Sequence, residues 1–277
     1  MYNYHMKLAI SNIAWTNEEE ADVAAKLREL GVRYVEIAPT KRWDDPTKAT
    51  PEQINEYVEW WRGYDIEVVA FQSMLFARPD LKLFESSELR NEMQQYMADF
   101  LRLAGDMGAG RLVFGSPKNR QRGAMSVEEA DGIASRFFAE LGDVAKEHNT
   151  MLCIEPNAPQ YNCDYVTTAD EGARLVRMVN SEGIGLHLDT ACMALAGDDI
   201  GESIRNNGDI LKHFHVSAPM LDRVYDRDDV DYRAAADALK HIGYEGMVSI
   251  EMRPGEQGEN VKRVADAVSF VQSVFEV

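Results

Sequence analysis

The segment MLCIEPN, residues 151–157, is a short apolar run that ends in a glutamate and passes into a loop that contains proline. The same arrangement recurs at GLHLD (185–189), KHFHV (212–216) and MVSIE (247–251), where an acid or a histidine lies at or beside the end of the run. Similar runs precede them at 7–11, 34–37, 67–71 and 111–114. Runs of this length and composition predict buried strands, so the sequence predicts eight of them.

Amphipathic helical stretches separate these runs. Ser126 with Glu129 and Thr168 with Glu171 have the spacing of capping boxes at helix starts. Regular alternation of strands and helices is typical of parallel α/β proteins, which include closed barrels and open doubly wound sheets. No glycine-rich dinucleotide turn follows the first run, and no linker interrupts the chain. We therefore predict one (β/α)8 TIM barrel domain over residues 1–277.

The composition and charge of the chain limit the binding partners and the cellular compartment that we expect for it. The net charge of −18 at pH 7 opposes binding to nucleic acid, and no apolar stretch is long enough to predict a membrane span. Three cysteines without zinc-type spacing indicate a reducing compartment. The start, MYNYHMKLAIS, lacks the pattern of a secretory leader. We expect a cytoplasmic protein without a nucleic-acid or membrane partner.

The last four runs each carry a residue that can bind a metal: Glu155, Asp189, His215 and Glu251. In a parallel barrel the carboxyl ends of the strands meet at one rim, where the chemistry takes place. Three carboxylates at such a rim repel one another unless a cation lies between them. The donor set of three carboxylates and one imidazole favours manganese, magnesium or cobalt over a structural zinc.

Four motifs carry a family resemblance. IEPN (154–157), HLDT (187–190), HFHVSAP (213–219) and SIEMRP (249–254) resemble the xylose isomerase-like barrel superfamily, in particular its sugar phosphate isomerase/epimerase branch with the ketose 3-epimerases. The resemblance implies that Glu155, Asp189, His215 and Glu251 bind one divalent ion, most often Mn²⁺, with Mg²⁺, Co²⁺ or Zn²⁺ as alternatives. It also implies a homo-oligomer.

The resemblance further implies that Glu155 and Glu251 are the catalytic acid and base. A cation next to a substrate carbonyl stabilises the enediolate that forms when the neighbouring proton is removed. A carboxylate on each face then takes one proton and returns another. We therefore predict a metal-dependent isomerase or epimerase that acts on a sugar, a keto-sugar or a sugar phosphate.

The predicted substrate contacts differ in part from the family pattern. Cys192 stands where ketose epimerases carry a histidine, and a glutamate that follows the first metal-binding glutamate is absent. The loop GSPKNRQRG (115–123) is the densest basic cluster and suits an anionic group. Strand-end and loop positions give the predicted substrate-binding set: Glu36, Gln72, Lys118, Arg120, Asn157, Cys192 and Arg253.

His187 and His213 lie two residues before Asp189 and His215, so strand alternation points them into the barrel one layer lower. We expect them to hold hydrogen bonds or fill the core, with direct metal binding the less favoured role.

Three other functions fit the same barrel. A sugar or cyclitol dehydratase begins with the same proton abstraction and differs in losing water. An apurinic-site endonuclease resembling endonuclease four needs extra histidines at strand ends where this chain has Gln72, Gly115 and Cys192. A non-catalytic sugar-binding protein is disfavoured by the four predicted ligands.

Overall fold

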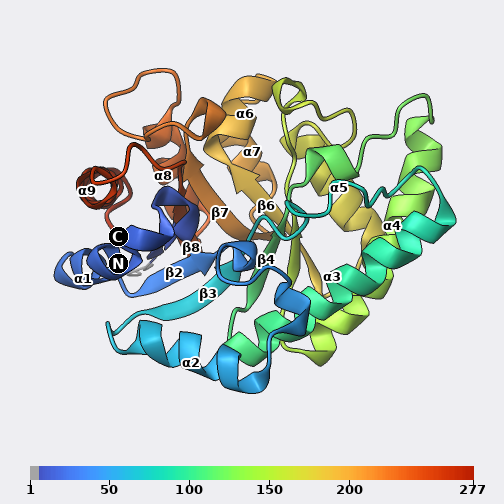
Figure 1. Cartoon of the computed structure of the whole chain (residues 1–277). Coiled ribbons are helices and arrows are strands. Elements are labelled where there is room, and N and C mark those ends of the chain that lie inside the picture. The colour runs from blue at the N-terminus through green and yellow to red at the C-terminus, as the bar shows by residue number, and fades with distance from the viewer. Residues whose placement is uncertain (1–5) are drawn as a thin grey trace.

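The computed structural model describes residues 6–277 as a closed barrel of eight parallel strands in sequence order (Figure 1). Residues 1–5 lie outside the described residues. They include the start of the predicted domain and of the segment MYNYHMKLAIS, from which we expect no secretory leader. The predicted (β/α)8 class is confirmed. The strands are β1 (Lys7–Ser11), β2 (Tyr34–Ile37), β3 (Glu67–Phe71), β4 (Arg111–Phe114), β5 (Leu152–Ile154), β6 (Ile184–Asp189), β7 (Leu211–Ser217) and β8 (Met247–Glu251).

Helices surround the barrel, and within the described part of the chain none is long and apolar enough to cross a bilayer. The predicted capping box is complete at the start of α4, where the Ser126 hydroxyl accepts from the Glu129 N–H and the Glu129 carboxylate accepts from the Ser126 N–H. At α5 the Thr168 hydroxyl accepts from the Glu171 N–H, but the Glu171 carboxylate accepts from the N–H of Thr167 instead of Thr168. The α-helices are α1 (Glu20–Glu29), α2 (Pro51–Arg62), α3 (Ser87–Met107), α4 (Val127–Glu147), α5 (Ala169–Val179), α6 (Thr190–Ala196), α7 (Ile200–Asn206), α8 (Tyr232–His241) and α9 (Asn260–Phe275).

The predicted strand ends agree closely with the observed ones. Five strands have the predicted bounds, while β6 is one residue longer at its start, β7 is one residue longer at each end, and β5 is one residue shorter at each end. Glu155 consequently follows β5 instead of ending it, because Pro156 comes next and has no backbone N–H for the sheet. The sequence analysis did not predict α6 and α7, since seven-residue helices are too short to show a helical period.

The interior of the protein has two parts, an apolar layer between the strands and the helices and a polar region inside the barrel. Outward-facing strand residues pack against the helices, as Phe214 of β7 does against Phe275 of α9. The upper interior is instead polar, although layers of branched apolar residues usually fill such barrels. Its buried members include Glu36, His187, His213, His215 and Ser249.

Glu19 fastens the last helix to the first. Its carboxylate accepts hydrogen bonds from the backbone N–H of Gly258 at 3.0 Å and from the N–H and side-chain amide of Asn260 at 3.2 and 2.6 Å. Asn260 is fully buried, and α1 and α9 lie side by side in Figure 1. This contact closes the outer ring of helices where α1 and α9 meet.

We expect Glu19→Ala to lower the free energy of unfolding by about 2 kcal/mol, because it leaves buried amide donors of Asn260 without an acceptor. Urea denaturation measures the change. The control is Glu18→Ala, which removes an exposed neighbouring carboxylate and should cost less than about 0.5 kcal/mol. Equal losses for the two variants would show that the contact adds nothing to stability.

Candidate metal centre

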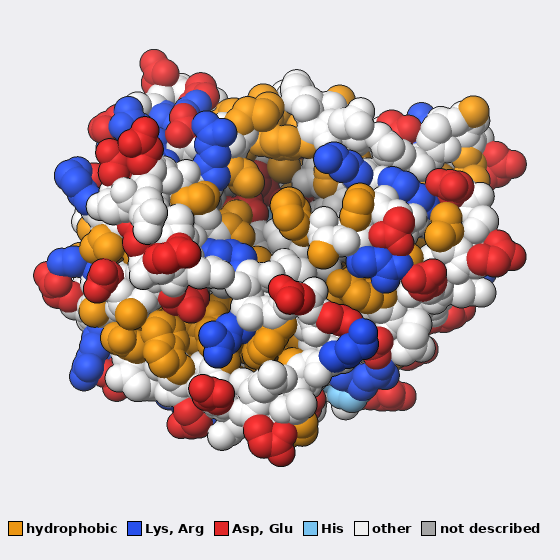
Figure 2. All heavy atoms as spheres, viewed as in Figure 1, with side chains coloured by type: hydrophobic (Ala, Val, Ile, Leu, Met, Phe, Trp, Pro, Cys, Tyr) orange, Lys and Arg blue, Asp and Glu red, His pale blue; other side chains and the backbone are white. Residues whose placement is uncertain are grey.

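Strand register brings the predicted ligands to one rim. Asp189 of β6 pairs with His215 of β7, Ser217 of β7 pairs with Glu251 of β8, and Glu155 directly follows β5. One ligand atom each from Glu155, His187, Asp189 and His215 lies within 4.8 Å of all the others. Figure 2 shows a hollow beside α6 that is rimmed by hydrophobic side chains and has acidic atoms at its floor.

Asp189 is oriented by two contacts. Its Oδ1 accepts a hydrogen bond from the Cys192 N–H at 2.7 Å and so caps α6, while its Oδ2 accepts one from the Ser217 hydroxyl. A carboxylate has about four lone-pair sites, so both oxygens keep capacity for a cation. One aspartate thus starts a helix and faces the cluster.

Glu36 orients His215. The Nε2 of His215 lies 3.1 and 2.9 Å from the two carboxylate oxygens of Glu36, which also accepts a hydrogen bond from Ser249 Oγ at 2.6 Å. Nε2–H therefore donates to Glu36 and leaves Nδ1 with a free lone pair that faces the rim, 3.5 Å from Glu251 Oε2. A carboxylate behind a histidine is the usual arrangement around metal-bound imidazoles.

The acids at the rim are crowded. Burial, followed by the charges of Glu251 and Asp189, raises the pKa of Glu155 to about 8. Burial also raises the pKa of Glu251 against the opposing charge of His215. Burial alone would raise the pKa of Glu36 too, but the charges of His215 and His213 and hydrogen bonds from His215 and Ser249 lower it to about 2. The negative charge of Glu36 is thus matched within the protein, whereas that of the rim acids is not.

The residues present fit a divalent cation. Oxygen donors come from Glu155 and Asp189, and a nitrogen donor comes from His215, whose buried Nδ1 has no hydrogen-bond partner in the described part of the chain. Buried polar atoms without partners are costly, and an ion at this point would satisfy that nitrogen and neutralise the acids. Glu251 lies at the edge of the group, where it contacts His215.

Gly115, which is outside the predicted set, and Arg120, which was predicted as a substrate contact, both adjoin Glu155. A Cβ on Gly115, directly after β4, would overlap a carboxylate oxygen of Glu155, so only glycine leaves room there. Arg120 donates to the carbonyl oxygen of Glu155 at 2.7 Å and to Asn157 Oδ1 at 2.9 Å, which fixes the loop after β5. The role of Gly115 leaves no signal in a single sequence, because it depends on packing between neighbouring strands.

Three of the predicted substrate contacts are buried and bonded to other groups of the protein. Arg120 is 1% exposed, and its guanidinium binds within the protein instead of opening to the rim. Glu36 is fully buried beneath the rim against His215. Gln72 is also buried, and its amide donates to the Ser11 hydroxyl. Each of these polar groups finds its partner inside the fold, which a sequence pattern does not reveal.

The other predicted contacts lie in two places. Asn157 and Cys192 are buried beside Asp189, with 3.6 Å between Asn157 Nδ2 and Cys192 Sγ. Lys118 and Arg253 are exposed, Arg253 two residues past Glu251 and Lys118 on a cleft of about 430 Å³ that Phe76 also lines. All seven substrate contacts stay predictions.

Comparisons with known proteins agree with this architecture. The sequence model of the xylose isomerase-like TIM barrel family matches residues 24–274. A D-psicose 3-epimerase of Agrobacterium fabrum is 31% identical over 128 residues, which is 46% of this chain and 41% of that protein. An L-ribulose 3-epimerase of Mesorhizobium japonicum is 26% identical over 41% of this chain and 38% of its own length. The matched segments thus span about two fifths of these relatives.

A solved structure extends the likeness to the whole fold. The D-psicose 3-epimerase of Clostridium cellulolyticum H10, crystallised with D-tagatose, superposes with a TM-score of 0.82 and 20% identity. The superposition covers 98% of this chain and 100% of that one. At this identity the match establishes a shared barrel.

We expect Asp189→Asn to weaken binding of Mn²⁺ by more than about 100-fold while the protein stays folded. The amide oxygen can still cap α6, but it brings no charge to the ion. Calorimetric titration with Mn²⁺ alone and thermal unfolding measure the two effects. The matched control is Asp199→Asn, at the equivalent cap of α7, which should leave Mn²⁺ affinity unchanged. Unchanged affinity in both variants would remove Asp189 from the centre.

We expect Glu36→Gln to weaken Mn²⁺ binding by about 10- to 100-fold, because a neutral amide orients and polarises His215 less well than a carboxylate. The same titration measures it. Glu20→Gln alters a glutamate that bonds Tyr57 far from the histidines and should bind Mn²⁺ as the unmodified protein does. If Glu36→Gln binds equally well, Glu36 does not act through His215.

Proposed function

The chain belongs to the xylose isomerase-like TIM barrel family, and from this premise we propose that it is a divalent-metal-dependent isomerase or epimerase that acts on a keto-sugar. The proposed ion is held by Glu155, Asp189 and His215, with Glu251 beside them as a further ligand. The charge and donor types of this set suit Mn²⁺, as predicted from the sequence.

The observation that carries the proposal is the exposure of two carboxylates at the mouth of the barrel. The side chains of Glu155 and Glu251 are 11% and 13% exposed, whereas that of His215 is 1% exposed. Strands β6 and β7 separate the two glutamates in the barrel wall, so they approach the cavity from different sides. A substrate carbon between them would meet one carboxylate on each face.

This placement supports proton transfer next to a carbonyl. A bound divalent ion would stabilise the negative charge that develops on the carbonyl oxygen. One of Glu155 and Glu251 removes the proton as a carboxylate, and the other delivers a proton to the opposite face as a carboxylic acid. The buried acids and histidines below them form a closed floor that keeps the reacting carbon at the level of the two glutamates.

We propose an unphosphorylated keto-sugar as the substrate class. The matched relatives are named for D-psicose and L-ribulose, and the guanidinium of Arg120, one of the basic groups in the loop after β4, is bonded to the carbonyl oxygen of Glu155. Cys192 and Asn157 contact each other beside Asp189, and we propose that they border the substrate. The thiol in place of a histidine indicates that the contacts to the sugar hydroxyls differ from those of the ketose 3-epimerases.

Metal analysis and an isotope screen test this function together. Purified protein is analysed for bound metal and then incubated with keto-sugars, free and phosphorylated, in deuterated water. An isomerase or epimerase gives deuterium at a carbon next to the carbonyl without other mass change. Loss of water would instead assign the dehydratase activity. Exchange that proceeds equally after removal of the metal would contradict metal dependence.

We expect Glu251→Gln to keep the fold and the ion but to lose at least about 100-fold in turnover, because an amide does not transfer the proton. Rates of deuterium incorporation by NMR on the substrate found in the screen measure the loss. Glu256→Gln changes an exposed glutamate in the loop after β8 and should react at the normal rate. Near-normal turnover in Glu251→Gln would rule out the role proposed for this residue.

A further inference from the structure

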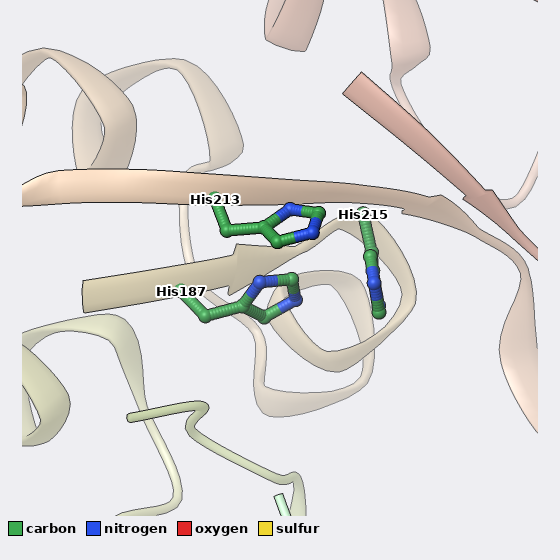
Figure 3. Close-up of side chains that lie close together, drawn as sticks. All are labelled: His187, His213 and His215. Carbon is green, nitrogen blue, oxygen red and sulfur yellow. The ribbon is translucent and has the colours of Figure 1, made fainter. Parts of the chain in front are cut away.

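His187 lies directly below the proposed ion. It extends from β6 two residues before Asp189, pairs in register with His213 of β7, and its ring centroid is 4.2 Å from that of His215. Figure 3 shows the three rings converging inside the barrel. The side chain of His187 is fully buried.

Neither ring nitrogen of His187 has a hydrogen-bond partner among residues 6–277. The two neighbouring histidines differ in this respect, since His213 Nδ1 accepts from the Phe214 N–H at 2.8 Å and His215 Nε2 bonds Glu36. A buried polar atom without a partner costs roughly 1–3 kcal/mol. A residue that leaves two such atoms unsatisfied in the protein alone therefore indicates a ligand at this point.

The acidic group nearest to the His187 ring is the carboxylate of Glu155. His187 Nε2 lies 3.7 Å from Glu155 Oε1, which is too far for a hydrogen bond. Two ligands of one ion, each bonded at about 2.0–2.1 Å in a tetrahedral arrangement, lie about 3.4 Å apart. The observed separation is thus within a few tenths of an ångström of that of two atoms that share a cation.

The group of potential ligand atoms within 4.8 Å of one another contains His187 alongside Glu155, Asp189 and His215. His187, His213 and His215 also satisfy this distance. The only free nitrogen of His215 is Nδ1, however, and it faces Glu251, so the carboxylate side is where His187 and His215 can share an ion.

We infer that His187 is itself a ligand of the metal, alongside His215 and the carboxylates of Glu155 and Asp189. This inference rests on the metal centre of the proposed function. With two nitrogen donors the site should prefer borderline ions such as Co²⁺ and Zn²⁺ over Mg²⁺ more strongly than three carboxylates and one imidazole would. It also leaves Glu251 less necessary as a ligand and freer to transfer a proton.

X-ray absorption of the protein loaded with Co²⁺ tests the inference without any measurement of activity, since scattering from imidazole rings counts the histidine ligands. We expect two in the unmodified protein, one in His187→Gln and two in the control His213→Gln. Calorimetric titration with Co²⁺ should show affinity at least tenfold weaker in His187→Gln and within threefold of normal in His213→Gln.

A single imidazole in the loaded, unmodified protein would overturn the role of His187 while leaving the metal centre intact. Failure of that protein to bind Co²⁺ would overturn both the inference and the metal dependence of the proposed function. Because the count is made on the unmodified chain, the test does not depend on the folding of either variant.

Discussion

Repulsion among acids at a common rim is the constraint on which the site depends. Glu155, Asp189 and Glu251 project from strand ends that the barrel holds close together, and the backbone offers them no way to separate. The protein matches one acid internally, by setting Glu36 against His215, and leaves the others facing the mouth. Because the described part of the chain does not fully neutralise the negative charge of these rim carboxylates, they are available to bind a cation and to act on a substrate.

Much of the fold was predictable because strands and helices alternate with clear periods. The ends of β6, β7 and β8 could be read from the sequence to within one or two residues, and parallel pairing then required Asp189, His215 and Glu251 to meet. This inference needs only the rule that parallel strands point the same way. It works without knowledge of any side-chain contact.

The depth and direction of individual side chains were not predictable. Alternation places Glu36 inside the barrel, but a register shift between Val35 and Glu36 helps to decide how far below the rim it lies. Arg120 belongs to a loop, where no period applies, and carbonyl groups of another loop determine its orientation. Gly115 matters only because a neighbouring strand brings Glu155 against it. All three depend on contacts between segments distant in sequence.

Asp189 belongs to the cluster of potential metal ligands and is also the N-cap residue of α6. The helix that it caps, α6, has seven residues, a length at which an isolated helix is unstable in water and depends on its first turn. A cation that withdraws electron density from the Asp189 carboxylate would also change the hydrogen bond that this carboxylate accepts from the Cys192 N–H at the start of α6. Binding of the proposed cation at Asp189 and the order of α6 would therefore be thermodynamically linked, so that filling the site would stabilise the helix beside it.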